Sequence, residues 1–401
     1  HSFAHVLKED PKKEGMLYLG IDNGLLISID DGKHWMQLKN NLPPAPIYWL
    51  EIQENYDDLI VSTYGRGYYI LDDLSALRQF NPNLKEWPQV FDPRTSYRLN
   101  NKESIKTDGY SFNSGRNPAY GTPINYYLPD NLTEKVSIEI RDRKNEIIRT
   151  LKGSNKSGVN RITWDLRYEP TYKPQLRTHP PGRPWVQLNG EGWRPLVTWD
   201  LDLLSGQYGP RVAPGKYKAL IIIDKVSFEK DLVVLKDPLA KGSLADVEEQ
   251  VQFSLALREA MNTAVTMINK IEYIRSELLI LKTSLKRNSE LKQIDRLMGI
   301  ANQIAGSLYD IQLTGAREDA FRSPMKLYGR LSALASEINS SGIDFKPTDQ
   351  QGAVYEILNQ RLQEAKGAFN ELTINEIRAF NKKLNDLDMQ IDMEKKMEKS
   401  N

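Results

Sequence analysis

The spacing of apolar residues changes near residue 240, and this change constrains the fold more than any other feature of the sequence. Up to about residue 237 apolar and polar residues alternate, as in KVSIEIRD, where Val136, Ile138 and Ile140 share one face. From about residue 243 apolar residues recur every three or four positions, as at Leu257 and Met261. A period of two predicts strands and a period of 3.6 predicts helices. We therefore expect β domains followed by a helical region.

Length and composition narrow the choice of protein class. A chain of 401 residues exceeds one ordinary core and predicts two or three domains. Lysine plus arginine (54) balances aspartate plus glutamate (53), so no overall field attracts nucleic acid. The absence of cysteine excludes disulfides, thiolate nucleophiles and cysteine-ligated zinc. No run of about 18 apolar residues predicts a membrane-spanning helix, and HSFAHVLKED lacks the pattern of a signal peptide.

Residues 1–80 consist of short predicted strands that repeat one plan. LYLGIDNGLLIS and LIVSTYGRGYYIL each contain a strand, a turn with glycine and a second strand. Repeated short antiparallel strands are typical of β-propeller blades. About two blades cannot close a ring and would leave sheet edges exposed. We therefore expect the other blades to precede this segment in a longer protein or to lie on another chain.

Residues 120–238 are predicted to form an immunoglobulin-like β-sandwich, after a linker over 81–119. Its expected strands lie in INYYLP, KVSIEIRD, EIIRTLKG, VNRITWDLR, GKYKALIIID and KDLVVLKDP. Their lengths and turn spacing fit a sandwich of about seven short strands. The stretch 170–214, rich in proline, glycine and tryptophan, is predicted to be a long ordered insertion in this sandwich.

Residues 239–401 are predicted to form an antiparallel bundle of four or five helices. Three segments carry the signal of a helix start: SLAD at Ser243, TDQQ at Thr348 and TINE at Thr373. In each, a hydroxyl precedes an acid or amide by three residues, which is the arrangement of a capping box.

The stretch SIDDGKHW contains Ser28, Asp30, Gly32 and Trp35 in the pattern S-x-D-x-G-x-x-W. An aspartate here can accept hydrogen bonds across a turn, glycine permits positive φ, and the tryptophan can pack over the hairpin. The pattern resembles the Asp box of BNR (bacterial neuraminidase repeat) and sortilin-like β-propellers. In that family the box lies at the blade periphery, away from the axis where sialidases work. The resemblance therefore implies a structural role for these four residues.

The segment TYGRGYYILDD resembles the T-H-G-R-G-x-W-I-L-D-D sequence that ends the propeller in large bacterial proteins of the BNR/VPS10-like class. Two interpretations of Arg66 remain. Together with Tyr64 and Tyr68 it could face the propeller channel and hold a ligand carboxylate, because a guanidinium binds carboxylates in bidentate fashion. Alternatively it forms an internal pair with Asp72, Asp73 or another blade.

The insertion 170–214 is a second candidate binding segment. Trp185, Trp193 and Arg194 belong to the residue types that are enriched at binding hot spots. The alternative is that these tryptophans anchor the insertion to its own domain.

No cofactor or resident metal is predicted. The four histidines lack the spacing of a metal site; they are His1, His5, His34 and His179. The turns DNG at Asp22 and DDG at Asp30 leave calcium as an alternative, although they lack the repeated oxygen ligands of a calcium loop.

The resemblance covers most of the chain, but its motifs indicate a family more than an activity. We favour a non-catalytic binding or scaffold subunit of an extracytoplasmic bacterial envelope or secretion assembly, using a sortilin-like propeller. It would lie in the periplasm, on the outer-membrane surface or outside the cell, with other envelope proteins as partners. The alternative is a glycan-active, sialidase-like hydrolase whose active site lies in other blades. A third reading is a sortilin-like peptide receptor.

Overall fold

The computed structural model combines several β-sheets with a C-terminal helical region, which confirms the predicted order of β domains and helices. It describes residues 2–39, 41–99, 115, 117–197, 206–285, 287–322, 324–340, 344–384 and 390–394. The chain divides into two compact units. Unit 1 comprises His1–Arg98, Glu103–Leu166 and Pro214–Lys236, and unit 2 comprises Leu99–Lys102, Arg167–Ala213 and Asp237–Asn401.

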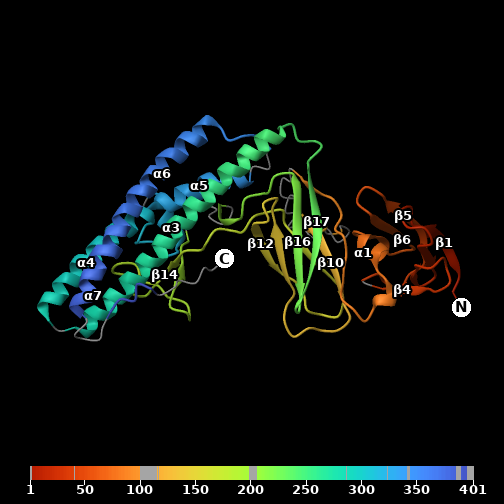
Figure 1. Cartoon of the computed structure of the whole chain (residues 1–401), viewed down its shortest axis with the longest axis horizontal. Coiled ribbons are helices and arrows are strands. Elements are labelled where there is room, and N and C mark those ends of the chain that lie inside the picture. The colour runs from red at the N-terminus through yellow and green to blue at the C-terminus, as the bar shows by residue number, and fades with distance from the viewer. Residues whose placement is uncertain are drawn as a thin grey trace. The chain divides into compact units, whose positions relative to one another are not determined.

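The N-terminal part of unit 1 contains two antiparallel sheets, drawn in red and orange in Figure 1. The four strands of the first sheet follow one another in sequence order: β1 (Ala4–Glu9), β2 (Leu17–Ile21), β3 (Gly24–Ser28) and β4 (Met36–Leu38). The second sheet has three strands in sequence order: β5 (Ile47–Gln53), β6 (Asp58–Thr63) and β7 (Gly67–Leu71).

The two N-terminal sheets share one apolar core. Alternation places Leu50 of β5 and Val61 of β6 on the inner face, against Tyr18 and Ile27 of the first sheet. At Gly20 of β2 an added Cβ would lie 2.6 Å from the Ile47 carbonyl oxygen. Glycine is therefore required where β2 and β5 approach each other.

A buried ionic network fastens helix α1 (Ser75–Gln79) to the first sheet. Arg78 Nε donates to both carboxylate oxygens of Asp10 at 3.0 and 2.9 Å, and its Nη1 donates to Asp57. The Tyr18 hydroxyl donates to Asp10 Oδ2 at 3.0 Å. Burial, followed by the Asp10 charge, raises the pKa of Tyr18, so this hydroxyl stays a donor.

The remainder of unit 1 contains two further sheets. One has the strand order β12-β11-β16-β17-β9, with β12 (Ile147–Lys152), β11 (Ser137–Arg141), β16 (Gly215–Ile223), β17 (Val226–Lys236) and β9 (Ser96–Arg98). The other has the order β13-β10-β8, with β13 (Gly158–Trp164), β10 (Thr122–Leu128) and β8 (Gln89–Val90). Trp164 of β13 meets Tyr217 of β16 edge to face, with ring centroids 5.3 Å apart, so the two sheets pack on each other.

The stretch 81–119, predicted as a linker, contributes structure to unit 1. It contains a short 3-10 helix, η1 (Pro82–Leu84), and the strands β8 and β9, of which β9 pairs with β17 in parallel. Strands of two and three residues are too short to show an alternating pattern, which is why the sequence does not reveal them. Residues 100–114 and 116 of this stretch lie outside the described residues.

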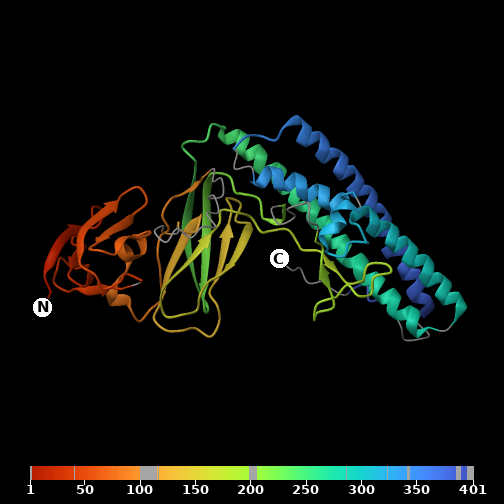
Figure 2. The same ribbon diagram turned by 180° about the vertical axis from the view of Figure 1, so that it is seen from behind.

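Unit 2 is built around one long helix, α3 (Leu244–Ser284), against which the other long helices pack (Figure 1; Figure 2 shows the opposite side). They are α4 (Asn288–Leu308), α5 (Leu327–Ser340) and α6 (Asp349–Asn370). Shorter segments are η2 (Arg317–Phe321), the π-helix η3 (Glu371–Ile377) and α7 (Arg378–Leu384). None of the described helices combines the length and apolar character needed to cross a membrane.

Two of the three predicted helix starts are confirmed. Ser243 caps α3 and Thr348 caps α6, each with both hydrogen bonds of a capping box. The predicted start at Thr373 is wrong, because this residue lies within η3, which continues α6 into α7. The Thr373 hydroxyl instead donates to the Phe369 carbonyl at 2.9 Å, four residues earlier. A threonine inside a helix can satisfy its hydroxyl in this way without ending the helix.

The described part of 167–213 belongs to unit 2, although the predicted sandwich domain over 120–238 contained all of it. It contains the short paired strands β14 (Gln175–Leu176) and β15 (Arg194–Pro195). Backbone amides of this segment donate to side chains on one side of α3: Tyr172 N to Asn262 Oδ1 at 2.9 Å, and Gln175 N to Asn269 Oδ1 at 2.8 Å. The insertion thus interrupts the sandwich in sequence and packs on the helices.

Candidate binding site

The SIDDGKHW segment forms the turn between β3 and β4. The Ser28 hydroxyl donates to Asp30 Oδ1 at 2.9 Å and accepts from Gly32 N at 2.9 Å. Asp30 also accepts from the His34 amide at 2.8 Å, and Trp35 Nε1 donates to the Gly32 carbonyl at 3.0 Å. Gly32 has a φ of 77°. The side chains of Ser28, Asp30 and Trp35 are thus all used to hold their own turn.

The charge of Asp30 is stabilised by this turn. Hydrogen bonds from the His34 backbone and then from its side chain lower the pKa of Asp30 to about 2. Such a carboxyl is ionised at neutral pH and is a poor proton donor there. This is the opposite of what a general acid requires.

The outer face of the β5–β7 sheet carries large apolar side chains that are exposed. Pairing across the three strands aligns Trp49, Ser62 and Tyr68 in one row, and Glu51, Ile60 and Ile70 in the next. Trp49 is 63 % exposed, Tyr68 78 % and Ile70 60 %. We call Trp49, Ile60, Tyr68 and Ile70 the aromatic face.

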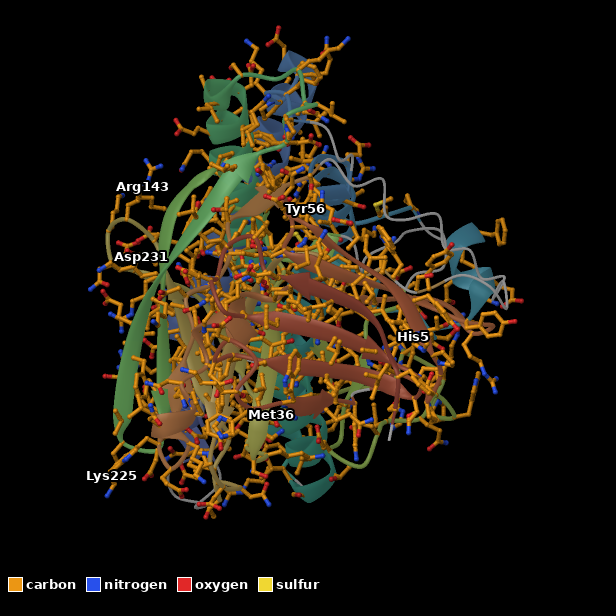
Figure 3. The ribbon with its side chains drawn as sticks, turned by 90° about the vertical axis from the view of Figure 1, so that its right-hand side faces the viewer. His5, Met36, Tyr56, Arg143, Lys225 and Asp231 are labelled. Carbon is orange, nitrogen blue, oxygen red and sulfur yellow. The ribbon has the colours of Figure 1, made fainter. Side chains whose placement is uncertain are left out.

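A group of stacked rings continues the aromatic face at one end of the strands. The β5–β6 register shifts between Ile47 and Trp49, so that Tyr48 and Trp49 are both exposed. The Tyr48 ring stacks on His5 with centroids 4.4 Å apart, and it lies 5.8 Å from the Tyr64 ring. Figure 3 labels His5 and Met36. His5 lies on β1 and Met36 on β4, which are the two edge strands of the first sheet.

The first sheet also has an apolar outer face. Leu7 of β1 pairs with Leu19 of β2, which pairs with Leu26 of β3. Leu7 is 59 % exposed and the other two are half-buried. We call these three residues the leucine row. The pair of N-terminal sheets therefore carries apolar residues on both outer faces as well as in its core.

Arg66 lies in the exposed turn between β6 and β7, flanked by Gly65 and Gly67 at φ values of 76° and 79°. Within the described part of the chain it forms no ion pair with Asp72 or Asp73. The neighbouring Tyr64 and Tyr68 are exposed as well, and Tyr68 belongs to the aromatic face.

Asp73 has a different partner from the one proposed for it. Its Oδ2 accepts from Asn125 Nδ2 of β10 at 3.0 Å, and Arg161 Nε of β13 donates to Asn125 Oδ1 at 2.8 Å. The end of β7 is thereby bonded to the three-stranded sheet of the same unit. Arg66 is left available at the surface for another partner.

The residues predicted in the insertion do not form one surface. Trp185 is exposed, and Trp193 is half-buried with its Nε1 donating to Glu191 at 2.7 Å. Arg194 is only 6 % exposed, and its Nε and Nη1 donate to the carbonyls of Thr178 and Leu313. Burial lowers the pKa of Arg194, although the Glu272 charge opposes this shift. Arg194 therefore lies inside unit 2 and ties the insertion to the helical region.

A buried carboxylate beside Arg194 was missed by the sequence analysis. Glu272 of α3 is fully buried and accepts hydrogen bonds from the backbone amides of Arg177 and Thr178 at 2.7 and 3.0 Å. It also accepts from Tyr309 at 2.6 Å and pairs with Arg275. The sequence feature that could have revealed this residue is an acid within the apolar stripe of a predicted helix. These contacts use the carboxylate to anchor the insertion.

The described histidines contact neighbouring groups. His5 Nε2 lies 2.7 Å from Asp22, His34 Nδ1 lies 2.6 Å from Asp30, and His179 Nδ1 lies 2.7 Å from the Val186 carbonyl. His1 lies outside the described residues. Among the residues that the structure describes, no three histidine or acidic side chains gather as metal ligands would.

Comparison with known proteins gives little for this chain. No family model and no curated protein matches it. The solved structures that match include two of the extracellular domain of one protein from B. thetaiotaomicron, described as a one component system and as a hybrid two component system. They are 12 % and 13 % identical to this chain, each covers 59 % of it, and each has a TM-score of 0.16. This chain spans only 25 % and 26 % of their lengths. Likeness at this level carries no argument about fold or function.

Proposed function

We propose that this chain is a non-catalytic binding or scaffold component whose N-terminal sheets are blades of a BNR or sortilin-like β-propeller. The observation that carries the proposal is the aromatic face. Trp49, Tyr68 and Ile70 lie exposed on a three-stranded sheet, and covering them would remove apolar surface from water. A sheet with this outer face gains stability when another sheet packs on it.

The N-terminal sheets have apolar residues on both outer faces, and this supports the proposal that they are propeller blades. A terminal sheet needs a polar outer face, whereas an inner blade of a ring has a neighbour on each side. Here the aromatic face and the leucine row are both apolar. The sequential antiparallel order of β1–β4 and of β5–β7 and the Asp box in the β3–β4 turn are also consistent with blades. The partner is therefore proposed to be further β-sheets, of the same protein or of another envelope protein.

The proposal includes an immunoglobulin-like class for the two-sheet part of unit 1 and an extracytoplasmic bacterial setting. The packing of Trp164 on Tyr217 between two mainly antiparallel sheets supports the former. The latter rests on the resemblance of the Asp-box and TYGRGYYILDD segments to extracytoplasmic propeller proteins.

Site-specific photocross-linking can test the proposal in the cells that produce the protein. A benzophenone amino acid would replace Tyr68 on the aromatic face or Leu7 in the leucine row. The matched control is Val226, which is exposed at the β16–β17 hairpin. We expect cross-links from both test positions to peptides with alternating apolar residues and an Asp-box pattern, and none of these from Val226.

Two results would contradict the proposal. If Tyr68 and Leu7 gave no more cross-linked product than Val226, the two faces would be free in the cell. If they cross-linked only to helical or disordered segments, the partner would not be a blade.

A further inference from the structure

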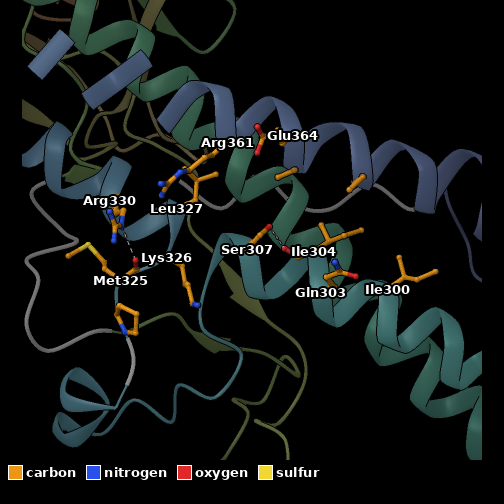
Figure 4. Close-up of a pocket in the computed structure, with 13 residues that line it drawn as sticks. Ile300, Gln303, Ile304, Ser307, Met325, Lys326, Leu327, Arg330, Arg361 and Glu364 are labelled. Carbon is orange, nitrogen blue, oxygen red and sulfur yellow. Dashed lines mark hydrogen bonds between the residues drawn. The ribbon is translucent and has the colours of Figure 1, made fainter. Parts of the chain in front are cut away.

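A groove on unit 2 consists of two adjoining chambers between helices. The first chamber has a volume of about 600 Å³ and lies between α4, α5 and α6. Its apolar lining includes Ile300, Ile304 and Leu327, which Figure 4 labels, and also Ala368. The second chamber, of about 590 Å³, lies between α5 and α6. Each volume falls within the range of about 300–1,000 Å³ that is typical of ligand pockets.

The second chamber is as apolar as the first, and the two meet at a pair of arginines. Leu334, Val354, Ile357 and Leu358 are among its lining residues. Arg330 of α5 and Arg361 of α6 line both chambers. The two arginine side chains therefore lie where the two apolar chambers adjoin.

Acidic side chains also line the groove, Glu364 in the first chamber and Glu337 in the second, but neither forms a described ion pair with an arginine. In the described part of the chain Arg330, Arg361 and the nearby Lys326 form no ion pair, and Arg330 Nε donates to the Met325 carbonyl at 3.0 Å. Figure 4 shows the Arg361 side chain extending from α6 toward α5, on the side where Arg330 lies. Glu364, the acid of the first chamber, accepts from Gln360 at 3.2 Å. Two guanidinium groups with free donors are suited to a phosphate or carboxylate.

We propose that this groove binds an anionic amphiphile with two hydrocarbon chains. Its phosphate or carboxylate head would lie between Arg330 and Arg361, and one chain would extend into each chamber. The position of the arginines decides between one chain and two, because a single-chain ligand would leave one apolar chamber uncovered beside its head. This site lies within unit 2 and does not depend on the function proposed for the N-terminal sheets.

Isothermal titration calorimetry of the full chain with short-chain lipids tests the proposal. The probe is dioctanoyl phosphatidic acid, kept below the concentration at which it aggregates. Dioctanoyl phosphatidylcholine has the same chains with a zwitterionic head, and inorganic phosphate has the anion without chains. We expect phosphatidic acid to bind at least about tenfold more tightly than either comparison ligand, because only it satisfies both parts of the groove.

Variants assign the binding to the groove. Replacing both arginines, Arg330→Gln and Arg361→Gln, should weaken phosphatidic acid binding by about tenfold or more. Lys366→Gln removes an exposed cation of α6 outside the groove and should change affinity by less than about twofold. Ala368→Trp should obstruct the first chamber and Ala333→Trp the second, and each should weaken binding. Circular dichroism of each variant checks that the helices are retained.

Three outcomes would overturn the proposal. Equal binding of the two lipids would show that the head is not recognised. Inorganic phosphate that bound as tightly as phosphatidic acid would indicate an anion site without a role for the chambers. An equal loss of affinity in Lys366→Gln and in the double arginine variant would place the interaction outside the groove.

Discussion

At the scale of single residues, one carboxylate organises the Asp-box turn. Asp30 accepts hydrogen bonds from the Ser28 hydroxyl and from the amide and ring of His34. These bonds favour the ionised form, so the pKa of Asp30 falls from 3.8 to about 2 in the folded chain. A group whose pKa is lower in the folded state stabilises the fold above its unfolded pKa, and this stabilisation is lost as pH falls through the folded pKa.

We predict that Asp30→Asn lowers the free energy of unfolding at neutral pH and that this difference from the wild type shrinks between about pH 4 and pH 2. Over that interval the wild-type carboxyl becomes protonated and loses the same interaction. Urea unfolding of both proteins at several pH values measures the difference, and NMR titration of the Asp30 carboxyl gives its pKa directly. A midpoint at or above 3.8 would contradict the prediction.

Glu272 has the corresponding role inside unit 2. The fully buried carboxylate binds two backbone amides of the insertion, the Tyr309 hydroxyl and Arg275. Removing its charge leaves the Arg275 guanidinium buried with a neutral partner and gives the site an amide hydrogen that has no acceptor.

Glu272→Gln is therefore expected to lower the free energy of unfolding of the helical region by about 3–5 kcal/mol. Glu376→Gln is the matched control, because it breaks the pair with Arg296 at a partly exposed site and should cost about 1 kcal/mol or less. Urea unfolding followed by helical circular dichroism compares the two. Equal losses would show that the buried network contributes no more than a surface pair.

At the scale of elements, the capping-box sequence pattern occurs both at true helix starts and inside a helix. Ser243 and Thr348 begin helices, whereas Thr373 lies within one. Ser243 and Thr373 each precede an acid by three residues, but only Ser243 accepts from the amide at the third helical position. Thr373 lies inside a continuing helix, and its hydroxyl donates to the Phe369 carbonyl four residues earlier.

We expect Ser243→Ala to cost about 1 kcal/mol of stability, since it leaves an amide of the first turn of α3 without an acceptor. Thr373→Ala should cost little or stabilise slightly, because alanine has the higher helix propensity. Thermal unfolding monitored at a helical wavelength measures both. If Thr373→Ala proved as costly as Ser243→Ala, the helix would begin anew at Thr373.

Periodicity predicted the strands and helices of this chain well and its insertion poorly. Alternation revealed β11 and β16, because one face of each strand is buried and the other is more exposed. The partner of the insertion remained hidden, since Asn262, Asn269 and Glu272 read only as polar interruptions of the apolar stripe of α3. Backbone amides donate to these side chains, and a backbone amide carries no sequence signal.

The sequence predicted only part of the candidate binding site. Motif resemblance drew attention to Arg66, Tyr64 and Tyr68, each of which is exposed in the structure. Arg194 was selected by residue type alone, and residue type does not report burial. Trp49 was overlooked because a tryptophan in an apolar strand is expected to point inward, whereas the register shift in β5 exposes it.

At the scale of the whole molecule, charge does little to keep copies of this chain apart. Its net charge is +1 at pH 7, and weakly charged proteins repel each other little. The aromatic face and the leucine row are then exposed on a molecule without strong electrostatic repulsion. Exposed apolar faces of this kind favour association when their usual partner is absent.

The purified chain is therefore predicted to self-associate reversibly through its N-terminal sheets. The double change Trp49→Ser and Tyr68→Ser should reduce this association at unchanged thermal stability, because both side chains are exposed and make little contribution to the core. Val226→Ser is the control, as it removes an apolar residue that is also exposed but lies away from these sheets. Sedimentation velocity over a range of concentrations measures the association. If association persisted in the double variant, or if Val226→Ser reduced it to the same extent, another surface would mediate it. Either result would weaken the case for a blade partner on the aromatic face.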